Sequence, residues 1–450
     1  MKKNILIITL LTVCILGSFT FAFASLLPQR DNVQFSETVL FGDSKAAKDL
    51  TIHYKNCFDY HLFWDTAWTI GTPPEAAVTD YRFSRKDYVD IYYPDAGIKM
   101  ESISFSSANQ SEGLQKAFEE LAETAKPNEE NISLIYISDY YEYYPVSVNI
   151  DLPGWKAFSL GPYGSSRDRI IQDFFKIPVF PDDTMEIQVF LNGTGGIAST
   201  RSSYGTDTLY NMEAKSVFTD DTCYFTFTTR ALGNQYVDTS LIPGGFGIYA
   251  FPYTETDIEL KKLSMVYPLD SKAQIVSMHL NSNQTALFLF TEEENGYYFT
   301  EIALETMETI QKLKILDPYI IYDDMIHTAD DYFAFYGSDS SDVSGYRIFS
   351  RDESGQFKYD FLIPSPKGEE RDYFNFYSEA TFAYDGERAA LTGTAVSTSH
   401  WSSAFTVAVY DRTGMLYCGE YNTGQNCRES SQGRYDCVPA ANQLAEISWS

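Results

Sequence analysis

The stretch Phe405–Tyr421, FTVAVYDRTGMLYCGEY, is the clearest indication of the fold that we expect for this chain. Its first half, up to Tyr410, is rich in aromatic and β-branched residues, which favour strands. A polar turn follows at Asp411–Gly414, and an apolar segment resumes at Met415. Asp and Gly are residues that reverse the chain tightly. The stretch therefore predicts a β-hairpin with an acidic turn.

The same strand, acidic turn and strand recur through the second half of the chain, at Phe246–Val266, Tyr298–Ile315, Tyr346–Ile363 and Phe405–Tyr421. The copies lie about 50 residues apart, which is a typical length for a propeller blade. A lone four-stranded sheet cannot cover both of its faces, whereas sheets stacked around an axis cover one another. We therefore predict an all-β, β-propeller-like fold with about seven blades, six to eight being compatible with the chain length.

One amphipathic helix is expected among the strands, near residues 111–125. Apolar residues recur there at helical spacing, beginning with Leu114, Ala117, Phe118 and Leu121, and Pro127 supplies a stop signal. We expect its apolar face to pack in a core. The predicted organisation is a leader at 1–27, irregular blades with the helical insertion at 28–220, four clearer blades at 221–422, and a cysteine-containing tail with a closing strand at 423–450.

The N-terminus has the features of an export signal. Lys2 and Lys3 precede an apolar run from Ile5 to Leu27, and Ala22-Phe23-Ala24 matches the small residues of a signal-peptidase site. The run is long for a signal peptide and just long enough to span a bilayer. We favour a cleaved signal peptide over an uncleaved membrane anchor. Both alternatives place the rest of the chain outside the cytoplasm, either secreted or anchored to the cell membrane.

The charge and composition of the chain exclude some classes of binding partner. The formal net charge is −29, and Lys and Arg form no cluster, which makes nucleic acid and anionic membrane surfaces poor partners. Aromatic residues make up 16% of the chain, in keeping with a β-rich fold. We expect a protein, peptide or glycan partner at the cell surface. Contact with the membrane is expected only through the N-terminal segment, if it is uncleaved.

The cysteines favour a disulfide over a metal site. The chain has six, and removal of the leader would leave an odd number outside the cell. Cys427 and Cys437 flank a polar stretch that would close as a local disulfide loop, with Cys418 as a competing partner. The cluster contains no C-x2-C pair and no nearby His, which argues against a zinc site, so we predict no metal. We also predict no cofactor.

Two hairpins resemble those of known propeller families. Val409–Tyr417 is similar to the strand-turn-strand unit of WD40-like and quinoprotein-like propellers. Ser350–Phe357 resembles an Asp-box, the turn of sialidase-type propellers, with one extra residue before the Gly. The resemblance covers about half of the chain and implies a structural turn on the rim. It suggests an exported bacterial propeller-like protein.

The candidate site residues are aromatic. Tyr140–Tyr144 is an unusual run, in which rings would stack on a sugar or anchor a protein partner. Core packing is the favoured role of most such rings, and the candidates for ligand binding are Tyr141, Tyr143 and Trp155. No catalytic constellation is recognisable, since the chain has no G-x-S-x-G motif and its carboxylates are too numerous for one pair to be selected.

We therefore expect an exported binding or scaffold protein that is not an enzyme. The alternative is a glycan-active hydrolase on the same propeller scaffold, which the Asp-box-like turn motivates. It would require a deep pocket lined by Arg, Tyr and carboxylates.

Overall fold

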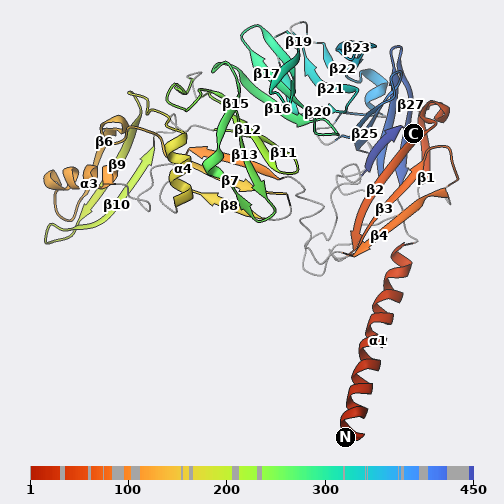
Figure 1. Cartoon of the computed structure of the whole chain (residues 1–450), viewed down its shortest axis with the longest axis horizontal. Helices are drawn as coiled ribbons and strands as arrows, with labels where there is room; N and C mark the ends of the chain where they lie inside the picture. Colours follow the sequence, from red (N-terminus) through yellow and green to blue (C-terminus); the bar gives the residue numbers. More distant parts are fainter. Residues whose placement is uncertain are drawn as a thin grey trace. The chain divides into compact units, whose positions relative to one another are not determined.

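Figure 1 shows the computed structural model of the chain. The structure describes residues 2–30, 36–58, 62–73, 76–83, 96–102, 112–153, 156–161, 166–204, 212–230, 236–317, 320–339, 341, 343–372, 374–376, 380–394, 404–422 and 445–449. The chain forms two compact units. The first combines Met1–Tyr92 with Tyr322–Ser450, and the second is Tyr93–Ile321.

The first unit contains three antiparallel sheets among its described residues. Their strand orders are β28-β2-β3-β4, β20-β21-β22-β23 and β1-β27-β26-β25-β24. The strands are β1 (Ser36–Gly42), β2 (Leu50–Phe58), β3 (Leu62–Thr69), β4 (Val78–Phe83), β20 (Ile320–Thr328), β21 (Tyr332–Ser338), β22 (Ser344–Arg351), β23 (Phe357–Pro364), β24 (Phe382–Tyr384), β25 (Ala389–Thr394), β26 (Ala404–Asp411), β27 (Gly414–Asn422) and β28 (Ala445–Trp449).

The second unit contains four sheets among its described residues. Their orders are β5-β7-β8, β10-β9-β6, β11-β12-β13 with β14 and β15 beside β13, and β16-β17-β18-β19. The strands are β5 (Gly97–Ser102), β6 (Glu130–Tyr136), β7 (Val146–Asp151), β8 (Ala157–Leu160), β9 (Thr184–Leu191), β10 (Ile197–Tyr204), β11 (Ala214–Phe218), β12 (Thr222–Phe227), β13 (Gly247–Thr254), β14 (Asp257–Ile258), β15 (Ser264–Pro268), β16 (Gln274–Leu280), β17 (Ala286–Glu293), β18 (Gly296–Ala303) and β19 (Glu308–Leu316).

The fold is all-β and propeller-like, which confirms the predicted class. Small antiparallel sheets follow one another along the chain, and the first strands of successive sheets lie side by side: β5 contacts β11, and β11 contacts β16. The Ile98 N–H on β5 donates to Ser216 Oγ on β11 at 2.9 Å. In a propeller, the innermost strands of neighbouring blades meet in this way. The sheets β5-β7-β8 and β10-β9-β6 interleave along the chain, so the blade number stays a prediction.

The acidic turns hold their own shape through hydrogen bonds from the Asp side chain. Asp352 Oδ1 accepts from the backbone N–H of Ser354 at 2.9 Å and of Gln356 at 3.1 Å, while Gly355 takes a φ of 80°. The side chains of Lys358 and Ser354, followed by these N–H groups, hold the pKa of Asp352 below its usual range. The Asp411 carboxylate likewise accepts from Thr413 N–H at 2.7 Å. These bonds are why Asp begins the turns of the repeated hairpins.

Both ends of the described strand set are paired inside the first unit. The N-terminal strand β1 pairs with β27, and the C-terminal strand β28 pairs with β2. In the second pairing Ile52 lies opposite Ile447, and both side chains are buried. β28 falls in the segment where a closing strand is expected.

The predicted amphipathic helix is confirmed as α3 (Glu112–Thr124). It packs on β9 and β6, and it buries Leu114, Ala117 and Phe118 in the core of the second unit. The other helices are α1 (Lys2–Arg30) and α4 (Ser166–Phe174), with short 3-10 turns η1 (Ser44–Ala47), η4 (Ile137–Asp139), η6 (Leu260–Lys262) and η7 (Gly368–Asp372). Within the described part of the chain, no helix has the length and apolarity required to cross a membrane.

Candidate functional site

The candidate site lies at one end of the contact between two neighbouring sheets of the second unit. The sheet β11–β15 and the sheet β16–β19 share an apolar cluster of Ile248, Ile275, Met278, Leu287, Leu289 and Ile302. Tyr224 and Leu304 are half-buried and pack against this cluster. The cluster therefore forms the apolar base of the site, and turns between strands of the two sheets form its walls.

The first turn, Thr219–Asp221, joins β11 to β12. Thr219 N–H donates to the carbonyl oxygen of Thr222 at 2.9 Å, and Thr222 N–H donates back to Thr219 Oγ1 at 3.1 Å. Tyr253 reinforces the turn, because its hydroxyl donates to the Thr219 carbonyl at 2.5 Å. The Asp221 carboxylate takes part in the turn, because its Oδ1 accepts from the hydroxyls of Thr222 at 2.8 Å and Thr219 at 3.4 Å. The side chains of Asp220 and Asp221 are both exposed to solvent.

Two turns of the neighbouring sheet complete the walls. In the turn from β16 to β17, Asn281 Oδ1 accepts from the N–H groups of Thr285 and Ala286, each at 2.8 Å. Gln284 in this turn has a φ of 54°, in the left-handed region. In the turn from β18 to β19, Leu304 N–H donates to the Thr285 carbonyl at 2.9 Å, which joins the two turns.

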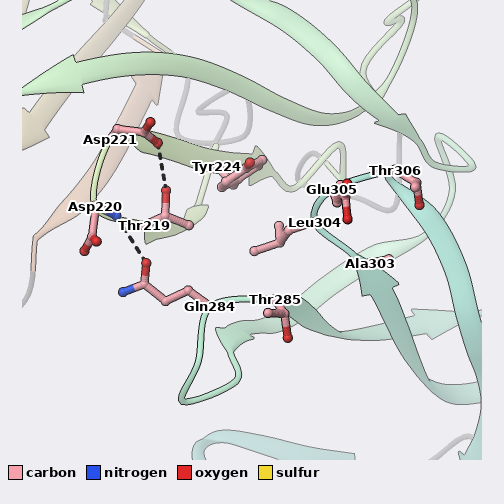
Figure 2. Close-up of a pocket in the computed structure, with 10 residues that line it drawn as sticks. All are labelled: Thr219, Asp220, Asp221, Tyr224, Gln284, Thr285, Ala303, Leu304, Glu305 and Thr306. Atoms are coloured by element: carbon pink, nitrogen blue, oxygen red, sulfur yellow. Dashed lines mark hydrogen bonds between the residues drawn. The ribbon is translucent and has the colours of Figure 1, made fainter.

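One hydrogen bond connects the two sheets across the site. The Asp220 N–H donates to Gln284 Oε1 at 3.2 Å. Figure 2 shows this bond, with Asp220 and Asp221 on one side of the site and Glu305 on the other. Tyr224 and Leu304 lie between these acidic groups.

The pocket is open to solvent and has a volume of about 550 Å³. Its lining is Thr219, Asp220, Asp221, Tyr224, Gln284, Thr285, Ala303, Leu304, Glu305 and Thr306. We call this set the acidic pocket. Its volume lies in the range of about 300–1,000 Å³ that is usual for small-molecule sites.

The acidic pocket carries three carboxylates and no Lys or Arg in its lining. Burial raises the pKa of Tyr224, and the neighbouring charge of Asp221 raises it further, so the phenol stays neutral at physiological pH. Because three carboxylates line the pocket, the polar atoms of the pocket are mainly hydrogen-bond acceptors. Such a site suits a cation with several N–H donors, and the Tyr224 ring offers a face for cation–π contact.

The carboxylates of this pocket are not arranged as a metal centre. Among the described residues, no group of three His, Cys, Asp or Glu side chains is placed to hold one ion. The pocket therefore presents separate charges around an apolar base.

The aromatic residues predicted as ligand-binding lie elsewhere in the same unit. Tyr141 is half-buried, and its hydroxyl accepts from Leu114 N–H in the first turn of α3 at 3.0 Å. Tyr143 is also half-buried, and its hydroxyl donates to Glu142 at 2.7 Å. The Lys176 ammonium stands 5.8 Å from the Tyr143 ring centroid. Neither tyrosine lines the acidic pocket, and their role in binding stays a prediction.

The other predicted site residues fall outside the described part of the chain. Trp155, Cys427 and Cys437 all lie there, so the predicted disulfide stays a prediction. Cys418 on β27 is buried, as is Cys223 on β12. Burial raises the pKa of both thiols.

The residues of the acidic pocket were not predicted as site residues from the sequence. Asp220-Asp221 reads as a solvated turn, and Glu305 begins an ordinary hairpin turn. The signal that would have found them is their common position. Each lies in a turn at the same end of successive sheets, and side-by-side sheets bring such turns together.

The comparisons with known proteins concern the fold alone. No protein-family model matches the sequence, and no curated protein matches it. Similar solved structures include the Cps50 (Swd1) β-propeller domain of Myceliophteria thermophila, with 9% identity and a TM-score of 0.27 over 65% of this chain and 86% of that one. A 6-phosphogluconolactonase-like protein of Bacteroides fragilis has 9% identity and a TM-score of 0.30, covering 83% and 94% of the two chains.

A protein from Lactobacillus plantarum gives 7% identity and a TM-score of 0.29, over 89% of this chain and 99% of that one. At such identities and TM-scores these likenesses carry no argument about function. The propeller-like assignment rests on the strand order and on the contacts between successive sheets.

Proposed function

We propose that this chain is an exported binding protein whose acidic pocket takes a cationic group, such as the guanidinium or ammonium of a peptide or protein side chain. The observation that carries the proposal is the lining of the pocket. Three exposed carboxylates surround an apolar base with an aromatic wall, and no cation of the lining neutralises them.

The chemistry favours a guanidinium over a compact ammonium. A guanidinium is planar and weakly hydrated, and it offers five N–H donors in a fixed fork. Its edge would meet the carboxylates of Asp220 and Glu305, while its face would lie along Tyr224. Gln284 Oε1 also lines this space, and it accepts from Asp220 N–H with one of its two lone pairs, so a second lone pair remains for the ligand.

The cellular location belongs to the same proposal. Lys2, Lys3 and the apolar run to Leu27 support export, and a protein or peptide at the cell surface is the proposed partner. N-terminal sequencing of the protein from its native cells tests this point. A mature N-terminus at Ser25 is expected, and a cytoplasmic protein that begins at Met1 would refute export.

Binding is tested with two peptides that differ only in charge. Isothermal titration measures the affinity of acetyl-Gly-Arg-Gly-amide and of the same peptide with citrulline in place of arginine. We expect the arginine peptide to bind at least about tenfold more tightly, because only it carries a charge to pair with the carboxylates. Equal affinity for the two peptides would refute the proposal.

The pocket is assigned with charge-removing variants. Glu305→Gln and Asp220→Asn keep size and the backbone N–H, and each is expected to weaken the arginine peptide by about tenfold. Glu255→Gln is the matched control, since Glu255 is exposed in the same unit but outside the lining. Loss of binding in the control, or hydrolysis of a glycan that stops in Glu305→Gln, would contradict a binding role for the pocket.

A further inference from the structure

A second surface of the chain, independent of the acidic pocket, is the free edge of strand β6. The sheet order β10-β9-β6 places β6 at an edge, and among the described strands it pairs only with β9. One face of this sheet is covered by α3, above the buried Met185, Ile187 and Val189 of β9. Figure 1 shows α3 beside these strands.

The other face of β6 exposes large apolar side chains in a row. Ile132, Leu134 and Tyr136 are exposed by 54%, 68% and 54%. They alternate along the strand and therefore point to the same side. Polar side chains normally occupy the solvent face of an antiparallel sheet, so this row is an exception.

The backbone of the same three residues points toward the free edge. Ile137 N–H donates to the Asp183 carbonyl of the neighbouring chain segment at 2.9 Å, directly after the register pair Tyr136 with Thr184. Antiparallel pairing alternates, so residues 131, 133 and 135 bond to β9. The N–H and C=O groups of Ile132, Leu134 and Tyr136 then face outward.

Natural edge strands usually carry a device that prevents pairing. Pairing is commonly prevented by a lysine or proline in the strand, by a β-bulge, or by another segment that covers the edge. The sequence of β6, ENISLIY, contains no Lys, Arg or Pro, and its register with β9 is regular through all seven residues. The edge is therefore competent to accept another strand.

The charges around β6 indicate what would pair with it. Glu129 and Glu130 precede the apolar row and Asp139 follows it, and all three are exposed. Lys126 is the nearby cation, 3.9 Å from Glu129. A second copy of this chain would bring its own net charge of −29 to the same edge. A segment with basic ends and an apolar middle is the complementary occupant.

We propose that β6 accepts an extended segment of another protein, with basic residues at its ends and apolar residues at alternate positions between them. The segment adds a strand to the sheet β10-β9-β6 through the outward backbone groups of Ile132, Leu134 and Tyr136. Its alternate apolar side chains cover the exposed row, and its basic ends meet Glu130 and Asp139.

The probe is a fluorescein-labelled peptide of sequence KTVTVTK, measured by fluorescence anisotropy with the full-length protein. All measurements use the Asp220→Asn, Glu305→Gln double variant as background, so that binding at the acidic pocket is strongly weakened. We expect saturable binding, and at least about a tenfold loss when alternate amides of the peptide are N-methylated, because these amides then cannot pair. Absence of binding, or equal binding of the two peptides, would overturn the proposal.

Two variants assign the binding to the edge. Leu134→Pro removes an outward N–H without removing a bond to β9 and is expected to abolish binding. Ile310→Pro is the matched control on the edge strand β19, where a register shift leaves Ile310 out of the pairing. It is expected to bind the peptide as well as the parent.

Two further experiments complete the test. A charge variant distinguishes loss of binding from a folding defect, and a measurement of molecular mass tests for self-association. Glu130→Lys keeps the strand intact, and it is expected to weaken KTVTVTK and to strengthen the acidic peptide ETVTVTE. Unchanged affinities would overturn the proposal. Sedimentation velocity is expected to show a monomer, and a concentration-dependent dimer that Leu134→Pro abolishes would assign the edge to a second copy instead.

Discussion

His279 provides a prediction of how stability depends on pH. It lies on β16, where its Nε2 is 2.6 Å from Ser277 Oγ and its ring meets Phe290 edge-on at a centroid distance of 6.0 Å. Burial, followed by the charge of Lys215, lowers the pKa of this imidazole to about 4. The folded protein therefore keeps His279 neutral at pH values where an unfolded chain would protonate it.

The sign and size of the effect follow from proton linkage. Between pH 6.5 and pH 4 the unfolded state binds a proton that the folded state does not, so stability falls as the pH is lowered through this window. The loss from this one group between pH 7 and pH 5 is at most about 2 kcal/mol, because the ring keeps some contact with solvent. Carboxylates also contribute to the pH dependence, but their contribution is shared by the parent and a His279 variant and cancels when the two are compared.

The assay compares urea unfolding at pH 7 and pH 5 for the parent and for His279→Gln, which keeps a polar partner for Ser277. Between pH 7 and pH 5 the variant is expected to lose less stability than the parent, by up to about 2 kcal/mol. His53→Gln is the control, since His53 bonds Ser448 Oγ at an exposed position. An imidazole NMR titration should leave His279 neutral at pH 5. A normal titration of His279, or an unchanged pH dependence in His279→Gln, would show that burial does not keep this imidazole neutral.

Three further predictions concern stability and reactivity. Ile447→Ala on the closing strand should cost about 3 kcal/mol of unfolding free energy, because it leaves a cavity, whereas the exposed Glu446→Ala should cost little; equal urea midpoints would contradict this. Asp360→Asn should cost about 1 kcal/mol by weakening the 3.0 Å bond from Arg412 Nε, and the cost should shrink in high salt; a salt-independent loss would argue against an ionic origin. Cys223, whose thiol pKa is raised by burial, should react with iodoacetamide only after unfolding; fast modification at pH 8 that peptide mapping locates at Cys223 of the native protein would contradict its burial.

The local elements of this protein follow from its sequence. The turns at Asp352 and Asp411 form because an Asp side chain bonds N–H groups two to four residues ahead, which is an interaction within a single short stretch. The helix α3 follows from the spacing of Leu114, Ala117 and Phe118, because one face of a helix must be buried. Both signals are contained in neighbouring residues, so the hairpins, the helix and the propeller-like class could be predicted.

The acidic pocket and the free edge of β6 were decided by the tertiary structure alone. Asp220 and Glu305 belong to different sheets, and they line one pocket because those sheets share an apolar cluster. Ile132, Leu134 and Tyr136 form a strand that reads as half-buried, and only the pairing order shows that it is an edge with its apolar side uncovered. Sequence specifies which side chains can be buried and how each turn bends. Which surfaces then meet depends on contacts between residues far apart in the chain, and no local pattern encodes these.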